Sequence, residues 1–320
     1  MAKKQISMAN NGNLRIVSLI PSASEIVAAL GYGDRLVGRS HECDYPAFIK
    51  QLPICTEPKF DPIGTSEQIH QRVTELLASA LSVYRVKTDV LAALNPTHII
   101  TQAQCEVCAV SLSDVEKAVT ELVSSAENSS PIKVVSLQPN QLADIWTDIA
   151  TVAAALGMPA EVAHQAIAHL QSRLPATATQ PHTTQPKVAC IEWTEPLMAA
   201  GNWVPELVAL AGGIDCLGTA GAHSAWMSWD ALTAAAPDII IVLPCGYDLT
   251  QTRQATAEMA THYQWNELNA VKQGNVYLAD GNQYFNRPGP RLVESCDILI
   301  EIIQGKPPNP ARATAGWEKW

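Results

Sequence analysis

The chain has 320 residues, of which 47% are hydrophobic, and a formal net charge of −10. This length is typical of two domains that each bury a core. No long basic run supports nucleic-acid binding, and no window approaches the roughly 18 apolar residues of a membrane span. The first residues also lack the apolar stretch of a secretory signal, which predicts a cytoplasmic protein. A periplasmic location would require that a signal had been removed.

The first half of the chain alternates apolar runs with helical patterns after a predicted tail over residues 1–13. This alternation predicts an α/β lobe with a parallel sheet over residues 14–139. The expected strands are 15–20, 36–38, 97–101 and 133–137, and the expected helices are 25–30, 66–82, 89–94 and 111–124.

The second half repeats the alternation after a segment without a strand pattern. Residues 140–174 carry apolar side chains at helical spacing and predict a helical span that joins the lobes, with a break at Gly157-Met-Pro159. A polar linker over 175–186, a second α/β lobe over 187–305 and a tail over 306–320 follow. The expected strands of the second lobe are 187–191, 239–243 and 275–278, and the expected helices are 204–210, 230–235, 264–271 and 291–303.

Short stretches of the two halves echo each other, which indicates two similarly built, Rossmann-like lobes. Glu25 and Glu206 open the matching stretches and lie 181 residues apart, whereas the matching Pro96 and Pro237 are only 141 apart. The first half therefore carries about 40 additional residues, between positions 38 and 91. This addition contains Ser40-His-Glu-Cys-Asp-Tyr-Pro46, a segment dense in groups that carry chemistry.

Four further features stand out: Val17-Ser-Leu-Ile-Pro-Ser-Ala-Ser-Glu-Ile26, Asp44-Tyr-Pro46, the paired Leu-x4-Pro-x2-Ile-Ile elements and Tyr284-Phe-x-Arg-Pro-Gly-Pro-Arg291. In these features the chain resembles the class III substrate-binding proteins of ABC importers. The most similar branch is that of the cobalamin-binding proteins, including a cytosolic subgroup that shares Cys105-Glu-Val-Cys108 and Pro244-Cys-Gly246. The resemblance implies two α/β lobes joined by one rigid helix, with a ligand held between the lobes. It also implies an ABC permease as partner, which the missing export signal makes doubtful.

Polar segments follow several predicted strands, at the strand ends where α/β proteins bind ligands. They outline a cleft between the lobes in which a large flat ligand would meet aromatic faces and a few polar groups. The alternative is that strand-end loops are simply polar and that the tryptophans fill the core. The residues predicted to bind the ligand are Ser22, His41, Glu42, Asp44, Tyr45, Glu192, Trp193, Trp203, Trp226, Trp229, Tyr284, Phe285 and Arg287.

His41, Cys43, Cys105 and Cys108 form a candidate metal site, because Cys105-Glu-Val-Cys108 has the spacing of a metal knuckle or a redox pair. Zinc or an iron-sulfur cluster would suit such ligands. The alternative is that the cysteines are ordinary buried thiols. His41 or a nearby thiol is also a candidate axial ligand for the cobalt of a corrinoid, because imidazole and thiolate both bind transition metals.

The favoured function is binding of a corrinoid such as cobalamin, and the sequence leans against catalysis without deciding the point. One alternative is a metal- or thiol-dependent enzyme that uses His41, Cys43, Cys105 and Cys108. Another is a receptor for a different metal chelate, haem or a siderophore. The sequence contains no phosphate-binding loop that ends in Lys-Ser/Thr and no nucleophile elbow. It leaves the oligomeric state open.

Overall fold

The computed structural model describes residues 13–79, 82–104, 110–125, 131–175, 185–310, 312, 314 and 316–320. The chain divides into two compact units. The first consists of Met1–Phe60, Leu76–Gln138 and Trp146–His169, and the second of Asp61–Glu75, Pro139–Ile145 and Leu170–Trp320. Among the described residues, no helix combines the length and apolarity needed to cross a bilayer.

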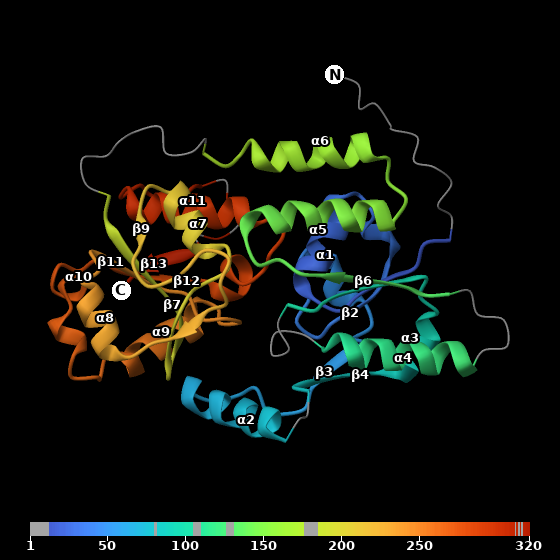
Figure 1. Cartoon of the computed structure of the whole chain (residues 1–320), viewed down its shortest axis with the longest axis horizontal. Coiled ribbons are helices and arrows are strands. Elements are labelled where there is room, and N and C mark those ends of the chain that lie inside the picture. The colour runs from blue at the N-terminus through green and yellow to red at the C-terminus, as the bar shows by residue number, and fades with distance from the viewer. Residues whose placement is uncertain are drawn as a thin grey trace. The chain divides into compact units, whose positions relative to one another are not determined.

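The first unit is built on a parallel sheet with the strand order β2-β1-β5-β6, of which β2 and β6 are labelled in Figure 1. Its register pairs Val17 with Ile99 and Ile100 with Val135, and the first three of these are completely buried. The strands are short, and each has an apolar stretch in its interior, as expected for a sheet whose two faces are largely covered. The bounds are β1 (Ile16–Ser18), α1 (Pro21–Ala29), β2 (Leu36–Arg39), α3 (Thr88–Leu94), β5 (His98–Gln102), α4 (Leu112–Ser125) and β6 (Lys133–Leu137).

The residues between β2 and α3 add a small element to this unit. β3 (Thr56–Pro58) and β4 (Tyr84–Val86) pair antiparallel, with Thr56 opposite Val86. Helix α2 (Ser66–Ala78) lies between these strands in the sequence, and its residues up to Glu75 group with the second unit. The predicted boundary at residue 139 did not anticipate this grouping, and the domain boundaries otherwise stay predictions.

The predicted helical span over 140–174 is two helices, α5 (Leu142–Ala155) and α6 (Ala160–Gln171), and not one. Gly157 has a φ of 76°, a left-handed conformation that glycine adopts without a steric penalty. Pro159, which lacks a backbone N–H, precedes the first residue of α6. The break predicted at Gly157-Met-Pro159 therefore separates two helices.

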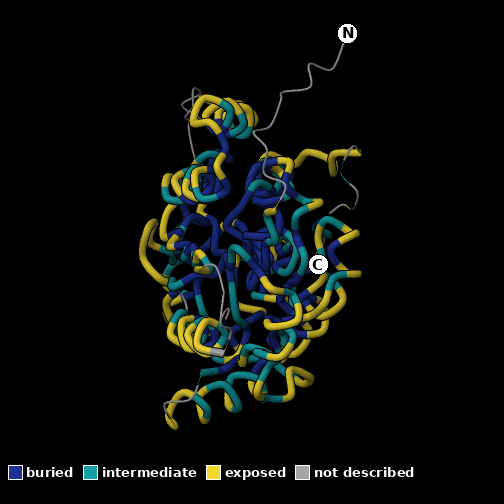
Figure 2. The backbone as a smooth tube through the Cα atoms, turned by 90° about the vertical axis from the view of Figure 1, so that its right-hand side faces the viewer, coloured by how far each residue is buried: buried dark blue, intermediate teal, exposed yellow. Residues whose placement is uncertain are grey.

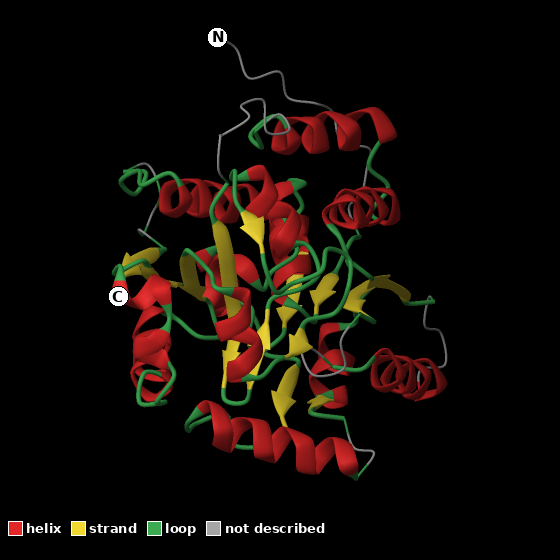
Figure 3. Ribbon diagram, turned by 60° about the vertical axis from the view of Figure 1, so that its left-hand side comes forward, coloured by secondary structure: helices red, strands yellow, loops and turns green. Residues whose placement is uncertain are grey.

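The second unit contains a mixed sheet with the order β10-β8-β7-β11-β12-β13, in which β9 also pairs with β7. The central strands β7, β11 and β12 are parallel, as predicted, while β8, β10 and β13 pair antiparallel. Figure 3 shows strands in yellow with helices in red beside them, and Figure 2 shows buried backbone in dark blue in the interior. The bounds are β7 (Lys187–Thr194), β8 (Leu197–Ala199), α7 (Val204–Leu210), β9 (Ile214–Asp215), β10 (Ala225–Trp226), α8 (Trp229–Ala235), β11 (Ile239–Val242), α9 (Leu249–Met259), α10 (Asn269–Lys272), β12 (Val276–Ala279), α11 (Leu292–Ile303) and β13 (Trp317–Lys319).

The C-terminal residues do not form the tail predicted over 306–320. β13 pairs with β12, with Trp317 opposite Ala279. The indole Nε1 of Trp317 donates to the carboxylate of Glu301 at 2.7 Å, and Glu301 is only 6% exposed. A buried carboxylate needs such partners, so this contact helps to hold the end of the chain in place. The predicted α/β fold with parallel strands is confirmed in both units.

Candidate ligand-binding site

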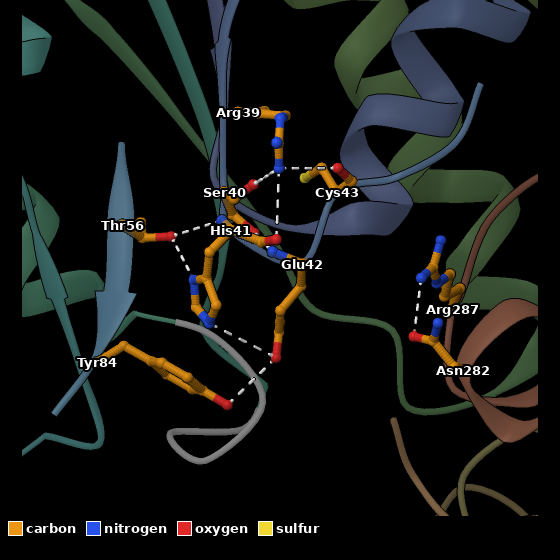
Figure 4. Close-up of polar contacts among 9 residues, drawn as sticks. All are labelled: Arg39, Ser40, His41, Glu42, Cys43, Thr56, Tyr84, Asn282 and Arg287. Atoms are coloured by element: carbon orange, nitrogen blue, oxygen red, sulfur yellow. Dashed lines mark hydrogen bonds and ion pairs between the residues drawn. The ribbon is translucent and has the colours of Figure 1, made fainter. Parts of the chain in front are cut away.

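The loop that follows β2 contains His41, and the side chain of Arg39 binds the backbone of this loop. The Nη1 atom of Arg39 donates to the carbonyl oxygens of Ser40, His41 and Cys43 at 3.0, 3.3 and 3.1 Å (Figure 4). Its Nη2 atom donates to the carbonyl oxygen of Lys50 at 3.2 Å. Arg39 is only 9% exposed. A charged donor that satisfies several carbonyls of one loop fixes the backbone conformation of that loop.

The imidazole of His41 lies against three side chains from the first unit (Figure 4). Its Nδ1 is 2.8 Å from Oγ1 of Thr56, which also accepts from the backbone N–H of His41 at 3.1 Å. Its Nε2 is 4.0 Å from Oε1 of Glu42, beyond hydrogen-bond distance. The ring centroid is 5.1 Å from that of Tyr84, whose hydroxyl donates to Glu42 at 3.3 Å. The ring is therefore oriented through one nitrogen.

His41 is held in its neutral form. Burial, together with the positive charges of Lys87 and Arg39, lowers the pKa of His41 from 6.5 to about 4, and Glu57 opposes the shift. At neutral pH the imidazole thus keeps a lone pair, which is the form that binds a metal. The side chain is still 23% exposed, so it is accessible to a ligand.

Cys43 differs from His41 in its accessibility. It is fully buried, its Sγ lies 3.9 Å from the carbonyl oxygen of Ser18, and burial raises the pKa of the thiol. Burial likewise raises the pKa of Cys55 to about 11. Both thiols are therefore poor sources of the thiolate that metal binding or nucleophilic chemistry requires.

No group of three or more His, Cys, Asp or Glu side chains is positioned to hold a metal ion in the part of the chain that the structure describes. Cys105 and Cys108 lie outside the described residues. The metal site predicted for these cysteines with His41 and Cys43 therefore stays a prediction.

The remaining predicted residues of the first unit differ in their accessibility. Ser22, in the first turn of α1, is 1% exposed and its Oγ has no hydrogen-bond partner among the described residues. Asp44 is half-buried, and Tyr45 is 45% exposed. Of these, Tyr45 offers an accessible aromatic face on the same loop as His41.

In the second unit, aromatic side chains gather near the carboxyl end of β7. Trp193 lies 5.3 Å from Tyr247 between ring centroids, and its Nε1 donates to the carbonyl oxygen of Glu195 at 3.0 Å. Trp229 stacks on His262 at a centroid distance of 4.0 Å and an interplanar angle of 5°. Broad aromatic faces of this kind suit a flat organic ligand.

The Trp229–His262 stack lines a pocket of about 250 Å³ in the second unit. Carboxylates and hydroxyls share the lining with apolar atoms, and a pocket of this size is smaller than a typical drug-sized site. The lining residues are Thr65, Glu67, Thr194, Glu195, Trp229, Ala255, Glu258, Met259, Thr261 and His262.

Trp226 is the most exposed of the predicted tryptophans, at 56%. The ring of His70, from α2, contacts it edge-on at a centroid distance of 5.0 Å. Glu192 is half-buried and accepts from the Ser224 hydroxyl at 2.8 Å, which orients its carboxylate.

The predicted residues Trp203, Tyr284 and Phe285 are at most 5% exposed. Nε1 of Trp203 donates to the carbonyl oxygen of Phe285 at 3.0 Å, an arrangement that favours a structural role for this pair. Arg287 is 3% exposed and donates to Oδ1 of Asn282 at 2.9 Å (Figure 4). The burial of Arg287 favours a structural role over the predicted contact with a ligand.

Several residues near the predicted ones were missed. Thr56, Tyr84 and Arg39 surround His41, while His70 and His262 contact the predicted tryptophans. A single sequence offers little sign of these contacts, because most of them join segments that are far apart in the sequence. The exception is Arg39, which comes directly before the loop at the end of a strand.

Comparison with known proteins identifies the family. The model of the family described as periplasmic binding protein matches residues 16–282. The chain belongs to the periplasmic binding protein family. A relative in this family, the vitamin B12-binding protein of Vibrio cholerae, is 23% identical over 297 residues, which cover 91% of this chain and 89% of that protein.

Solved structures of periplasmic binding proteins share the fold. The periplasmic heme-binding protein RhuT from Roseiflexus sp. RS-1, in apo form, has a TM-score of 0.65 and 23% identity, and the match covers 92% of this chain and 99% of that one. The periplasmic vitamin B12-binding protein BtuF of Vibrio cholerae has a TM-score of 0.61 and 21% identity, with 91% and 96% covered. The fold is thus that of class III, and the chain is a substrate-binding protein for a small molecule.

The predicted cytoplasmic location is wrong. The matching family is described as periplasmic, and the similar solved structures are periplasmic proteins by name. The prediction depended on the lack of a secretory signal at the first residues, and the point where a sequence begins does not determine where the protein works. The doubt about an ABC permease had the same basis, and the partner of this chain stays a prediction.

Proposed function

We propose that this periplasmic binding protein binds a corrinoid, with His41 as a ligand to the cobalt. The observation that carries the proposal is the neutral, half-buried imidazole of His41, with Nδ1 beside Thr56 and Nε2 outside hydrogen-bond distance of Glu42. A neutral imidazole whose second nitrogen is engaged by a hydrogen-bond partner is the usual arrangement of a metal-binding histidine. The vitamin B12-binding relative from Vibrio cholerae supports the choice of corrinoid.

The roles of the neighbouring side chains follow from their contacts. When Nε2 binds the metal, Nδ1 carries the proton and donates it to Thr56 Oγ1, which has lone pairs for this bond as well as for the backbone N–H of His41. Arg39 keeps the loop backbone in place. Tyr84 covers one side of the imidazole, and Tyr45 offers its exposed ring to the periphery of the macrocycle.

Haem is the second candidate, and the same geometry supports it. Imidazole binds iron as well as cobalt. The similar solved structures include heme-binding proteins, one of them with a TM-score of 0.65.

An enzyme that uses thiols has no comparable support among the described residues. Cys43 and Cys55 are buried with raised pKa values, so neither supplies a thiolate near neutral pH. Family membership instead supports delivery of the ligand to an ABC permease.

Calorimetry of the purified chain against hydroxocobalamin, hemin and a ferric siderophore tests the proposal. Saturable binding of hydroxocobalamin with an affinity at least tenfold above that for hemin supports a corrinoid ligand. Preferential binding of hemin would identify haem, and not a corrinoid, as the ligand. Binding of the siderophore alone, or of none of the three, contradicts the proposal.

A further inference from the structure

The segment Asp61–Glu75 is placed unusually in the chain. It lies between β3 and β4 of the first unit in the sequence, within the added 40 residues, yet it groups with the second unit. It contains the first ten residues of α2. Ser66 is the one buried residue of this helix. Ile63, just before the helix, is 78% exposed. The segment therefore buries little apolar surface where it docks.

A pair of hydroxyls anchors the segment to the second unit. Oγ of Ser66 and Oγ1 of Thr194 are 2.7 Å apart, and the two residues are 2% and 3% exposed. Thr194 is the last residue of β7, so the helix is fixed to the end of a central strand. A hydrogen bond between two neutral hydroxyls is a weak anchor, because water competes for both hydroxyls once the helix lifts.

The docked segment covers two features of the second unit. The His70 ring contacts the ring of Trp226 edge-on. Thr65 and Glu67 contribute to the lining of the pocket that also contains Trp229 and His262. Withdrawal of the segment would therefore free the part of the Trp226 ring that His70 contacts and remove one wall of the pocket.

We propose that Asp61–Glu75 is a strap that docks reversibly over Trp226 and the Trp229–His262 pocket, with the Ser66–Thr194 hydroxyl pair as its latch. The strap opens to let ligand enter and leave the second unit, and it adds His70 to the residues that the ligand meets. The ligand part of this inference rests on the proposed function, whereas the opening of the strap does not. Low apolar burial is what makes a segment open at little cost in free energy.

Locking the latch tests the strap. In the variant Ser66→Cys/Thr194→Cys, a disulfide replaces the hydrogen bond and holds the strap closed. Stopped-flow absorbance with hydroxocobalamin should give association and dissociation rates at least tenfold lower for the oxidised protein than for the same protein after reduction with TCEP. Equal rates in the two states would overturn the strap. Ser66→Cys alone is the matched control: it cannot form the disulfide, so its rates should be the same under oxidation as after reduction with TCEP.

A measurement on the ligand-free protein tests the strap independently of the proposed corrinoid ligand. Hydrogen exchange followed by mass spectrometry should show faster amide exchange over residues 66–75 in Ser66→Ala than in the wild type, with exchange in β7 and β11 unchanged. The strap is contradicted if exchange over 66–75 is unchanged. If the reduced double variant and the wild type both fail to bind hydroxocobalamin while this acceleration is seen, the corrinoid proposal fails and the strap stands.

Discussion

Thr56 Oγ1 lies 2.8 Å from Nδ1 of His41 and 3.1 Å from the backbone nitrogen of the same residue. One hydroxyl on β3 thus fixes both the main chain and the ring of a histidine in the loop after β2. Because Thr56 is 1% exposed, water does not readily replace it. The direction of Nε2 is consequently set by the fold before any ligand arrives.

Removal of the Thr56 hydroxyl should weaken ligand binding through His41. Thr56→Val keeps the shape of the side chain and loses the partner of Nδ1. Partners of metal-binding histidines are typically worth about 10–100-fold in metal affinity, and we expect a loss in this range for hydroxocobalamin by calorimetry. Thr56→Ser, which retains the hydroxyl, should bind within about threefold of the wild type. An unchanged affinity in Thr56→Val would show that this contact does not serve binding.

His41 should make the ligand-free protein less stable in mild acid. The charges around it are Lys87, Arg39 and Glu57, with Glu42 nearby, and the pKa of His41 falls from 6.5 to about 4 on folding. The unfolded chain therefore takes up the proton first, so the contribution is present in full above pH 6.5 and is lost as the pH falls toward 4. Urea unfolding at pH 7, 5.5 and 4.5 should show a smaller acid loss in His41→Asn than in the wild type. An identical pH dependence in both proteins would contradict the low pKa.

Arg39 should stabilise the first unit far more than an exposed arginine does. Loss of its hydrogen bonds leaves the buried carbonyl oxygens of the His41 loop without a donor, and a bond from a charged group contributes about 1.5–3 kcal/mol. We expect Arg39→Lys to lower the free energy of unfolding by about 2 kcal/mol in urea titrations. Arg35→Lys is the control, because Arg35 pairs with the exposed Asp34, and it should change stability by at most about 0.5 kcal/mol. Equal effects of the two substitutions would refute this role.

Glu301 should hold the C-terminal strand on the second unit. Its carboxylate accepts from Nε1 of Trp317 at 2.7 Å, from Nη2 of Arg312 at 2.5 Å and from the backbone N–H of Asn309 at 2.9 Å. Breaking a buried ion pair typically costs about 3–5 kcal/mol, and we expect Glu301→Gln to cost about 3 kcal/mol in the unfolding of this unit. Glu258→Gln, at an exposed site on α9, serves as the control. If the β13 amides stay protected from hydrogen exchange in Glu301→Gln, Glu301 does not hold the C-terminal strand in place.

Elements with a strong local pattern could be predicted from the sequence. β6 was expected at 133–137 and α7 at 204–210, and both have those bounds. A continuous apolar run defines the first, and Pro205 in the first turn marks the second. The antiparallel pair β3 and β4 could not be predicted in this way, because each strand has three residues and their register depends on a partner distant in sequence. β13 was missed for the same reason.

The candidate site was predicted in part. The loop around His41 stood out because histidine, cysteine and carboxylates are concentrated there. That Cys43 points into the core while His41 remains accessible depends on the packing of β1 and β2, which local sequence does not reveal. Trp203 was grouped with the ligand-binding tryptophans on residue type alone, whereas its indole is bonded to the carbonyl oxygen of Phe285 inside the second unit.

The absorbance spectrum of bound hydroxocobalamin tests most directly whether His41 ligates the cobalt. The account predicts that the wild-type chain shifts the corrinoid bands on binding, and that His41→Ala abolishes the shift. His164→Ala, at an exposed position on α6, should leave the shift intact. A shift that persists unchanged in His41→Ala would contradict the central claim.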